Sequence, residues 1–392
     1  MHGIFSVGPA SFGLGAVALN LCRAQREQKC SSEVWCLDSV EDVKWAALTS
    51  GLSLERIRRF PCIGSKALGY SLSMERLATG AIGREFDIVH QHCIWSGVFR
   101  TTRTLHQKYN VPYIIAPHGS LEPWALSRYR WGKKLALFFY EAKNLRNAAC
   151  LHALSKQEMA GFREFGLRTP IAVIQNGISQ SWLASEGDAE DFRRSFDIMP
   201  GKRILLYLSR ITPVKGILLL VEAMAAVRKD LDNWILVLAG MGDSGHLAEI
   251  RAAIKKYHLE NHVVFTGMLI NQAKRDAFAA ADLFVLPTKR EAAPVVVLEA
   301  LGAGLPVLTT KGAPWEDLVS HHSGWWVDVD AGAIAEALHD ALSQSTEQLL
   351  LMGQRGKELV ASKYTWAKSA QMTIELYEWL LGRRERPDFV VI

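Results

Sequence analysis

The stretch that decides the fold is ILLYLSRITPVKGILLLVEAMAAVRKDLDNWILVLA, residues 204–239. It begins with a short apolar run at 204–208, continues through a longer apolar run at 217–229, and ends in a second short run at 234–239. Short apolar segments that alternate with longer helical ones are typical of parallel βαβ units, whose strands are buried on both faces. The stretch therefore predicts a strand, a crossover helix and a second parallel strand.

The same alternation extends in both directions along the 392-residue chain, which is long enough for two ordinary domains. On the N-terminal side we expect strands at 3–7, 33–37, 88–90, 113–116, 151–153 and 171–174, and helices at 16–29, at 135–149 and from 155. On the C-terminal side we expect strands at 263–266, 283–286, 306–309 and 324–327, and helices at 246–257, 271–280, 296–302 and from 331 onward. These elements predict two doubly wound α/β sheets, which bind ligands at the carboxyl ends of their strands.

The boundary between the two domains is expected at a turn. Asn176-Gly177 is a turn dipeptide, and a polar segment follows it at 179–191. We therefore predict an N-terminal domain of residues 1–178 and a C-terminal domain of residues 179–371. An amphipathic final helix is long enough to return to the first domain, so residues 372–392 are expected to complete it.

Composition favours a globular protein in a reducing compartment. Hydrophobic residues make up 49% of the chain and charged residues 22%, and no stretch reaches the ~18 apolar residues of a membrane span. The uncharged stretch 3–22 lacks a basic segment before it and contains Pro9, Gly13 and Gly15, so we interpret it as a strand-turn-helix junction rather than a secretion signal. All six cysteines lie in the first 150 residues without a Cys-x-x-Cys pair, which disfavours zinc and indicates a cytoplasmic protein.

Basic charge is concentrated in the N-terminal half. Residues 1–178 carry 22 Lys and Arg against 13 Asp and Glu (+9), whereas residues 179–392 carry 23 against 27 (−4). Part of the excess lies in one aromatic-basic segment that includes Arg128, Arg130, Trp131, Lys133 and Lys134, with Lys143 and Arg146 further on. Two interpretations stay open for this segment: contact with an anionic membrane or a phosphate-bearing acceptor, or an ordinary solvated helix face.

Two cations follow the strand at 204–208, in Ser-Arg210-Ile-Thr-Pro-Val-Lys215-Gly216. When a glycosidic bond to a nucleoside diphosphate breaks, negative charge builds up on the departing phosphates. Fixed cations stabilise that transition state more than the ground state. Arginine offers phosphate a planar fork and lysine a compact point charge. We expect Arg210 and Lys215 to hold the diphosphate; the alternative is two surface cations in a loop.

Two glutamates flank a predicted helix start in Glu291-Ala-Ala-Pro-Val-Val-Val-Leu-Glu299. The unsatisfied amides of this helix start would point at an anion, over the segment Ala292, Ala293, Pro294, Val295 and Val296. Glu291 is expected to accept hydrogen bonds from the transferred sugar, although an acidic residue there would also suit the helix dipole. Glu299 lies within an apolar segment, where an unpaired carboxylate would be costly, so we expect ribose hydroxyls to satisfy it.

Further candidates lie at other strand ends. His118 follows the strand at 113–116 and would hydrogen-bond a sugar hydroxyl near the reacting carbon, unless it is a structural histidine. The glycine loop around Gly13 precedes a helix and would place amides against phosphate, or is a plain turn. Gly240 lies in a turn after the strand at 234–239. The backbone of Met268 is expected to hydrogen-bond the edge of the nucleotide base.

A metal ion is not expected. His90-Gln-His92 has the alternation of strand positions and no third ligand is evident in the sequence, so we interpret the pair as structural or as a wall of the binding site. Asp230-Leu-Asp232 and Asp328-Val-Asp330 adjoin helices rather than a credible metal position. Lys215 and Arg210 would take the place of a divalent cation.

Together these pieces resemble the retaining GT-B glycosyltransferases of the GT4 type over nearly the whole chain. The matching pieces are the N-terminal glycine loop, His118, Asn176-Gly177, Arg210 with Lys215, Gly240-x-Gly242, Phe265-x-Gly267, and Glu291 with Glu299. Two departures stand out: Phe12-Gly13 replaces the usual double glycine, and Gly312-Ala-Pro314-Trp315-Glu316 replaces the usual Gly-Gly-x-x-Glu. That aromatic variant, with Trp124 ahead of the basic segment, is similar to enzymes of bacterial envelope and exopolysaccharide assembly.

The resemblance implies two Rossmann-like domains facing across a cleft and a metal-independent transfer that retains anomeric configuration. It implies a UDP- or GDP-sugar donor, with UDP-glucose the first expectation because it is frequent in the family. The implied acceptor is a saccharide or a polyprenyl-diphosphate-linked saccharide at the inner face of the plasma membrane, and no nucleic acid. The implied roles are diphosphate binding by Arg210 and Lys215, ribose binding by Glu299, donor-sugar binding by Glu291 and His118, and phosphate approach by Gly13. Two other classes remain: a nucleotide-sugar 2-epimerase or sugar phosphorylase, and a non-catalytic carbohydrate-binding protein.

Overall fold

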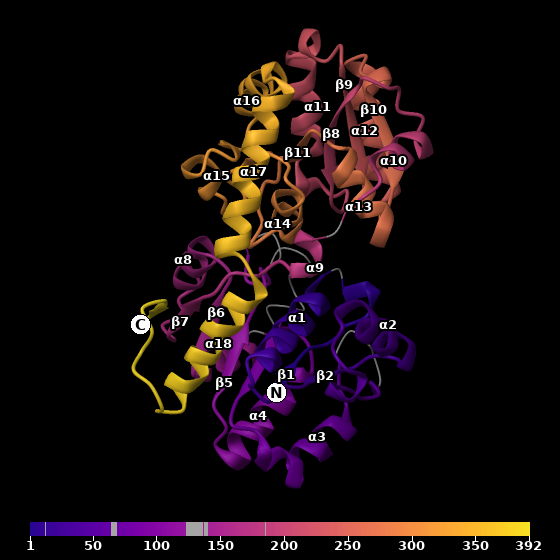
Figure 1. The fold of residues 1–392 in the computed structure, drawn as a ribbon. Coiled ribbons are helices and arrows are strands. Elements are labelled where there is room, and N and C mark those ends of the chain that lie inside the picture. Colours follow the sequence, from indigo (N-terminus) through magenta and orange to yellow (C-terminus); the bar gives the residue numbers. More distant parts are fainter. Residues whose placement is uncertain (12, 64–68, 123–135, 137–139, 185) are drawn as a thin grey trace. The chain divides into compact units, whose positions relative to one another are not determined.

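The computed structural model describes residues 1–392 except 12, 64–68, 123–135, 137–139 and 185 (Figure 1). Contacts divide the chain into two compact units. Unit 1 comprises Met1–Asn176 together with Trp366–Ile392, and unit 2 comprises Gly177–Thr365. Each unit has its own sheet and its own hydrophobic core; the unit 2 sheet is parallel, and the unit 1 sheet is parallel apart from one edge strand.

The division lies close to the turn at 176–177 but differs from the expected bounds by a few residues. Ile178 belongs to unit 2, because its amide donates to the carbonyl of Tyr364 at 2.8 Å and it forms a parallel bridge with Thr365. The chain returns to unit 1 at Trp366, earlier than the expected residue 372. Trp366 and Ala370 of the returning helix are buried against Val17 and Leu21 of α1 (Leu14–Glu27), which explains the earlier return.

The described residues of unit 1 form an eight-stranded sheet in the order β14-β7-β6-β5-β4-β1-β2-β3. Neighbouring strands are parallel except for β14, which pairs antiparallel with β7. The strands are β1 His2–Gly3, β2 Val34–Cys36, β3 Ile57–Arg59, β4 Val89–His92, β5 Tyr113–Ala116, β6 Cys150–Ala153, β7 Ile171–Val173 and β14 Val390–Val391. The strand order reverses between β1 and β4, which is where doubly wound sheets bind ligands.

Two helices of unit 1, one near each end of the chain, pack against each other. α1 and α18 share an apolar contact through Val17, Leu21, Ala24, Trp366 and Ala370. The α-helices described are α1 Leu14–Glu27, α2 Val40–Ser50, α3 Leu72–Thr79, α4 Val98–Tyr109, α7 Ala142–Asn147, α8 Lys156–Glu164 and α18 Trp366–Leu380. The 3-10 turns are η1 Pro9–Ser11, η2 Leu54–Arg56 and η3 Ala81–Glu85.

Unit 2 contains a six-stranded parallel sheet in the order β10-β9-β8-β11-β12-β13. Numbered from its first strand, this order is 3-2-1-4-5-6, the Rossmann order, and it reverses between β8 and β11. The strands are β8 Arg203–Leu208, β9 Trp234–Ala239, β10 Val263–Gly267, β11 Leu283–Leu286, β12 Val307–Thr310 and β13 Gly324–Val327. The apolar runs of β8, β9 and β11 are almost fully buried, as expected for strands covered on both faces.

Helices surround this second sheet. They are α9 Gln180–Leu183, α10 Ala189–Ser195, α11 Ile217–Ala226, α12 Ser244–Lys256, α13 Asn271–Ala280, α14 Val295–Gly302, α15 Asp317–Ser320, α16 Ala331–Ser343 and α17 Thr346–Lys363. The 3-10 turns are η5 Pro213–Lys215, η6 Arg228–Asp230 and η7 Glu260–His262. None of the described helices is long and apolar enough to cross a membrane.

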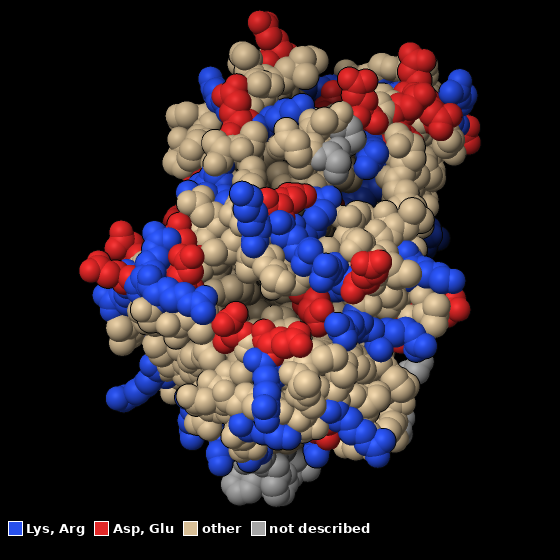
Figure 2. All heavy atoms as spheres, turned by 60° about the horizontal axis from the view of Figure 1, so that its bottom comes forward, with Lys and Arg blue, Asp and Glu red and all other residues tan. Residues whose placement is uncertain are grey.

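The surface carries both signs of charge. Figure 2 shows basic and acidic side chains interspersed over one face. The predicted aromatic-basic segment, with Arg128, Arg130, Trp131, Lys133 and Lys134, lies outside the described residues. Lys143 and Arg146, which follow it in sequence, lie on α7.

Candidate active site

The site in unit 2 is built around an ion pair between Lys215 and Glu291. Lys215 ends the turn η5 after β8, and Glu291 lies in the loop after β11. Because β8 and β11 are neighbours at the reversal of strand order, their carboxyl ends bring the two loops together. The Lys215 side chain is 7% exposed and Glu291 is partly exposed, so the pair presents its carboxylate side to solvent.

Glycines let the surrounding loops approach closely enough to form this pair. Gly216 has φ +72°, and a Cβ there would lie 1.9 Å from the carbonyl oxygen of Pro287. A Cβ on Gly312 would lie 2.2 Å from the carbonyl oxygen of Thr288. The Glu291 amide donates to the Gly312 carbonyl at 2.7 Å. The loops after β8, β11 and β12 therefore form one tight backbone arrangement beneath the ion pair.

Burial makes Lys215 an unusual lysine. Desolvation, and then the positive charge on Arg210, lower the pKa of Lys215 to about 7. The Glu291 carboxylate acts in the opposite direction, and a bound diphosphate would do the same, since both favour the ammonium form. Arg210 lies on the exposed side of the loop, where its carbonyl accepts a hydrogen bond from the Tyr207 hydroxyl at 2.8 Å.

Glu299 is not the unpaired carboxylate that the sequence suggested. It lies on α14 and pairs with Lys274 of α13, with 2.6 Å between Nζ and Oε1. The indole of Trp182 donates to the Glu299 carbonyl at 2.9 Å, and the Lys274 ammonium lies 5.3 Å from the Trp182 ring centroid. The argument from an isolated buried charge was therefore wrong: Glu299 is partly exposed and has a cation of its own.

The start of α14 has the features expected of an anion-binding helix end. Its cap residue Pro294 makes no side-chain cap hydrogen bond, and its first turn contains no acidic residue. The Val297 amide bonds back to the Pro294 carbonyl at 3.1 Å. Ala292, Ala293, Val295 and Val296 are partly exposed, whereas Pro294 is buried. The helix start directly follows the loop that holds Glu291. Its N-terminal amides are therefore close to the ion pair in sequence.

The turns after β9 and β10 complete this edge of the unit 2 sheet. Gly240 has φ +152°, and a Cβ there would lie 1.9 Å from the Ser209 carbonyl oxygen. Its amide donates to the Gly267 carbonyl at 2.7 Å. Met268 follows with 58% of its surface exposed. The structure thus places Gly240 and Met268 at the same sheet edge as Lys215.

In unit 1, His118 occupies a strained turn after β5. Its φ is +51°, and its Nε2 lies 3.0 Å from Nδ1 of His92. After the neighbouring strand β4, Cys93 and Trp95 also have positive φ, at +64° and +75°. Such conformations cost about 1–3 kcal/mol each in non-glycine residues and gather at functional sites. Their position at adjacent strand ends supports a functional role for this edge.

Glu158 supports the His118 turn and was not predicted from the sequence. Its carboxylate accepts from the Gly119 amide and from the Leu154 amide, both at 2.7 Å. It is almost fully buried, and burial raises its pKa to about 7. Gly13, at the start of α1, has φ +97°, and no atom among the described residues lies within 4 Å of the place where a Cβ would stand. Residue 12 beside it lies outside the described part of the chain.

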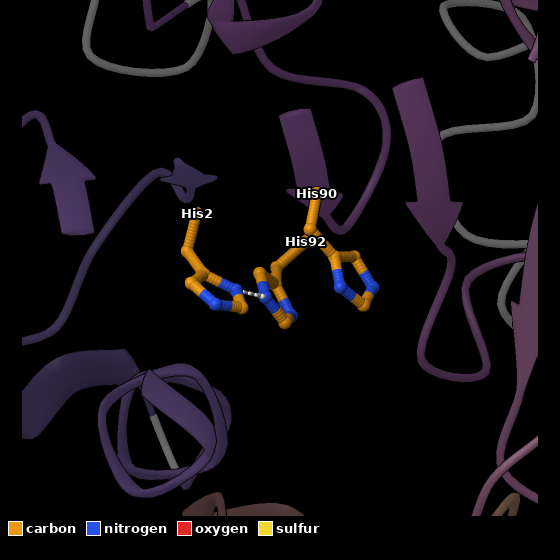
Figure 3. Close-up of side chains that lie close together, drawn as sticks. All are labelled: His2, His90 and His92. Atoms are coloured by element: carbon orange, nitrogen blue, oxygen red, sulfur yellow. Dashed lines mark hydrogen bonds between the residues drawn. The ribbon is translucent and has the colours of Figure 1, made fainter. Parts of the chain in front are cut away.

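His90 and His92 are joined by a third imidazole that the sequence did not reveal. His2 of β1 lies beside them, and one ring nitrogen from each of the three lies within 4.8 Å of the others (Figure 3). However, His2 Nδ1 lies 2.9 Å from His92 Nε2, whereas two nitrogen ligands of a tetrahedral zinc lie about 3.4 Å apart. All six ring nitrogens of these residues have hydrogen-bond partners, which favours a hydrogen-bonded cluster over a metal site.

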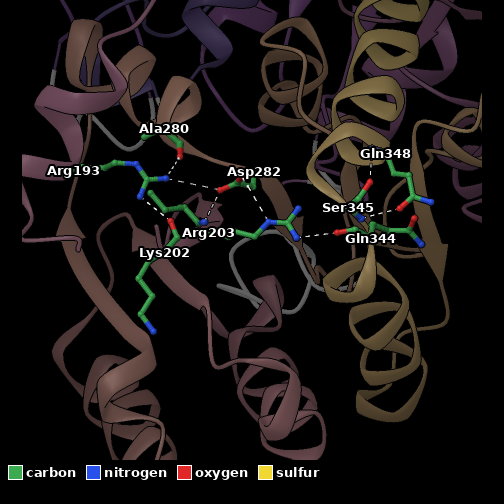
Figure 4. A network of polar contacts seen from close by, with 9 residues as sticks. Arg193, Lys202, Arg203, Ala280, Asp282, Gln344, Ser345 and Gln348 are labelled. Carbon is green, nitrogen blue, oxygen red and sulfur yellow. Dashed lines mark hydrogen bonds and ion pairs between the residues drawn. The ribbon is translucent and has the colours of Figure 1, made fainter. Parts of the chain in front are cut away.

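A different polar cluster lies at the opposite, amino end of the unit 2 sheet (Figure 4). Asp282 accepts from the Ile204 amide at 2.8 Å and lies within 4.0 Å of the guanidinium groups of Arg193 and Arg203. Arg193 also donates to the Lys202 carbonyl at 2.8 Å. These bonds hold the starts of β8 and β11 together, so this cluster is structural.

Comparisons with known proteins agree with this geometry. Residues 12–177 match the family model described as a glycosyl transferase 4-like domain, and residues 188–359 match the model of glycosyl transferases group 1. The two matches together cover most of the chain. It belongs to the GT4-type glycosyltransferases. The α-maltose-1-phosphate synthase of Mycolicibacterium smegmatis is 25% identical over 392 aligned positions, covering 94% of this chain and 96% of that protein.

One further relative and one solved structure are similar to this chain. The lipopolysaccharide core biosynthesis mannosyltransferase LpsB of Rhizobium meliloti is 25% identical and covers 72% of this chain and 81% of its own length. Anabaena Alr3699/HepE, solved in complex with UDP-glucose, has a TM-score of 0.74 at 19% identity, covering 97% of this chain and all of that one. The fold of this GT4-type glycosyltransferase is therefore GT-B, as the sequence predicted.

For a GT4-type glycosyltransferase, the Lys274–Glu299 pair yields a specific prediction. Glu299→Gln removes the charge and keeps the shape, so the donor KM should rise about 10- to 100-fold, the effect of one charge-assisted hydrogen bond. If Glu299 binds the ribose as expected, kcat should change little, because such a contact would act equally on the ground and transition states. Initial rates at varied donor concentration measure both terms. Glu347→Gln, at an exposed glutamate of α17, is the control; an unchanged donor KM in Glu299→Gln would remove Glu299 from the nucleotide site.

Proposed function

We propose that this GT4-type glycosyltransferase moves a hexose from a UDP-sugar to a saccharide or lipid-linked acceptor in bacterial polysaccharide biosynthesis, with retention of anomeric configuration. The observation that carries the proposal is the buried Lys215, paired with Glu291 where the unit 2 sheet reverses its strand order. A buried cation beside a helix start suits a diphosphate, and a carboxylate in contact with it suits sugar hydroxyls.

The proposed mechanism assigns one task to each group. Lys215, Arg210 and the amides at the start of α14 stabilise the negative charge that develops on the leaving UDP. Glu291 accepts hydrogen bonds from the sugar, and Glu299 with Lys274 holds the ribose. In unit 1, His118 binds a sugar hydroxyl.

The substitution is proposed to occur on the front face. The acceptor oxygen forms a bond to the anomeric carbon as the bond from that carbon to the diphosphate oxygen breaks. The acceptor proton passes to a phosphate oxygen of the departing UDP. Glu291 is in contact with Lys215, which suits a carboxylate that binds rather than attacks. A glycosyl-Glu291 adduct trapped from the reaction would instead indicate a double displacement.

The acceptor class is proposed from the charge pattern of the chain and from the name of one relative. The aromatic-basic segment of residues 128–134 would contact an anionic membrane at the cytoplasmic face, where lipid-linked saccharides are presented. The relative LpsB is named as a lipopolysaccharide core biosynthesis mannosyltransferase, which agrees with an envelope saccharide as acceptor. Sedimentation with anionic vesicles checks this part, and equal binding by wild type and by Lys133→Ala with Lys134→Ala would contradict it.

Two assays test the donor and the metal requirement. A thermal-shift panel of nucleotide sugars should show the largest stabilisation with a UDP-sugar, and UDP-glucose is the first candidate. UDP release from that donor should continue unchanged in EDTA, because Lys215 and Arg210 supply the positive charge. Loss of turnover in EDTA that Mg²⁺ restores would contradict the metal-independent mechanism. Binding without any UDP release or sugar transfer would favour a carbohydrate-binding protein.

A further inference from the structure

A continuous chain of hydrogen bonds runs through unit 1 and ends at His118. Its members come from α1, α18 and the strand or turn positions of β1, β4, β5 and β6: His118, His92, His2, Gln25, Tyr377, His90 and His152. The far end is the carbonyl of Ile174, 2.8 Å from Nε2 of His152. The links between neighbouring members are 2.8–3.2 Å long.

The donor-to-acceptor direction of this hydrogen-bond chain is fixed at its far end. A carbonyl oxygen only accepts, so His152 carries its proton on Nε2 and its Nδ1 accepts from Nε2–H of His90. His90 Nδ1 then accepts from the Tyr377 hydroxyl at 2.8 Å. With its proton used there, Tyr377 accepts from the Gln25 amide nitrogen at 3.2 Å.

The same logic continues to the near end. The Gln25 carbonyl oxygen accepts from Nε2–H of His2, whose Nδ1 accepts from Nε2–H of His92. His92 Nδ1 accepts from Nε2–H of His118. This leaves Nδ1 of His118 without a proton. That atom is buried and has no hydrogen-bond partner among the described residues.

The assignment requires neutral rings, and the environment provides them. His2, His90, His92 and His152 are at most 3% exposed. Burial lowers the pKa of His2 and of His118 to about 3 and that of His152 to about 4, and it lowers the pKa of His90 and His92 well below the usual range. The rings also stack closely, with 4.7 Å between the centroids of His90 and His92, so a charge on one disfavours a charge on the next.

We propose that this hydrogen-bond chain holds His118 in the Nε2–H tautomer, so that its Nδ1 accepts a hydrogen bond from a substrate hydroxyl. The inference rests on the proposed function for the nature of that hydroxyl, a sugar O–H. It gives the other six members a positioning role. An unprotonated Nδ1 attracts a hydroxyl and repels phosphate or carboxylate oxygens, so this position selects a neutral part of a glycosyl substrate.

The test removes one atom that the hydrogen-bond chain needs. Tyr377→Phe removes the hydroxyl that links His90 to Gln25, after which the Gln25 amide is free to turn over. Tyr113→Phe is the matched control, because it removes another buried hydroxyl of unit 1, one that donates to the Asn144 carbonyl at 2.9 Å outside the chain. Nitrogen-detected NMR of the full chain labelled with ¹⁵N-histidine reads the tautomer of each ring, and the signals that disappear in His118→Asn identify His118.

At pH 7 we expect a single Nε2–H tautomer for His118 in the wild type and in Tyr113→Phe, and a mixture of both tautomers in Tyr377→Phe. In Tyr377→Phe, kcat/KM for the sugar donor should fall about 2- to 10-fold, in line with the fraction of correct tautomer, while UDP affinity stays unchanged. A charged or Nδ1–H His118 in the wild type, a single tautomer in Tyr377→Phe, or zinc-bound imidazole signals would overturn the inference. The NMR result does not depend on turnover, so it stays separate from any failure of the proposed function.

Discussion

Replacing Lys215 with alanine should lower kcat/KM by about 10²- to 10³-fold, the effect of losing one preorganised contact to developing charge. Lys215 is buried and in contact with Glu291, so the substitution removes the cation and also leaves that carboxylate without its partner. Both consequences act at the position where the departing diphosphate is expected to bind. Initial-rate kinetics with saturating acceptor measure the change.

The control for this substitution lies at the other end of the same strand. Lys202 precedes β8, and its ammonium donates to the Asp232 carbonyl. Lys202→Ala therefore removes one charge from unit 2 far from the carboxyl edge and should leave kcat/KM within about twofold, as is usual for surface substitutions. If Lys215→Ala folds normally by circular dichroism and retains wild-type rates, Lys215 has no role in leaving-group departure.

The pH profile gives a second readout of the same lysine. Burial lowers the pKa of Lys215 towards 7 and contact with Glu291 opposes that shift, so the free enzyme loses this positive charge between pH 7 and the pH at which an ordinary lysine titrates. We expect kcat/KM, which reports on the free enzyme, to fall through pH 8 and 9. Lys215→Arg keeps its charge throughout this range and should flatten the profile.

Acid should unfold unit 1 before unit 2. The histidines His2, His90, His92, His118 and His152 have lowered pKa values in the folded state and values near 6.5 when unfolded. Below pH 6.5 the unfolded chain therefore binds more protons than the folded chain, and the free energy of unfolding falls as the pH falls. Each histidine contributes about 1.4 kcal/mol per pH unit, so five contribute about 7 kcal/mol per unit. Against a typical stability of 5–15 kcal/mol, unfolding is expected near pH 5.

Glu158 partly offsets this effect. Burial raises its pKa to about 7, so the folded state takes up this proton first and gains stability as the pH falls. Burial also raises the pKa of Asp38 and Glu141 in unit 1, but these three carboxyls do not balance five histidines. In unit 2, Lys215 is already charged below pH 7 and adds no further change between pH 6.5 and 4.

Calorimetry at a series of pH values measures the difference between the units. We expect one melting transition to move to lower temperature between pH 7 and pH 5 while the other stays nearly fixed. His339→Ala is the control, because this exposed histidine, whose pKa Asp230 raises, lies outside the cluster. Two transitions that move in parallel, or no acid shift above pH 5, would contradict the neutral burial of the cluster.

The sequence predicted the framework of unit 2 more closely than that of unit 1. The strands at 234–239, 283–286 and 324–327 were predicted with the bounds that β9, β11 and β13 have, because each is an apolar run between clear breaks. In unit 1 the strand expected at 3–7 is only two residues long as β1, and β3 and α4 were not expected. β3 carries two arginines and α4 is mostly polar, so neither has an apolar run to detect.

The site residues differ in the same way: those that follow a strand could be predicted, and those that meet only through packing could not. Lys215 and Glu291 were expected at one site because each follows a strand, and strand ends at the reversal of order meet; their direct ion pair was not predicted. Lys274 was missed as the partner of Glu299, since the two lie on different helices with no shared motif. His2 and Gln25 lie on β1 and α1, far apart in sequence, and Tyr377 reaches Gln25 only because the C-terminal helix α18 packs on α1. No local pattern reports such a contact.

A crystal structure with UDP tests the central claim most directly. The account predicts the diphosphate about 3 Å from Nζ of Lys215, beside Arg210 and the first turn of α14, with the ribose hydroxyls at the carboxylate of Glu299. A well-defined UDP bound elsewhere, with the Lys215–Glu291 pair unchanged and free of ligand, would contradict it.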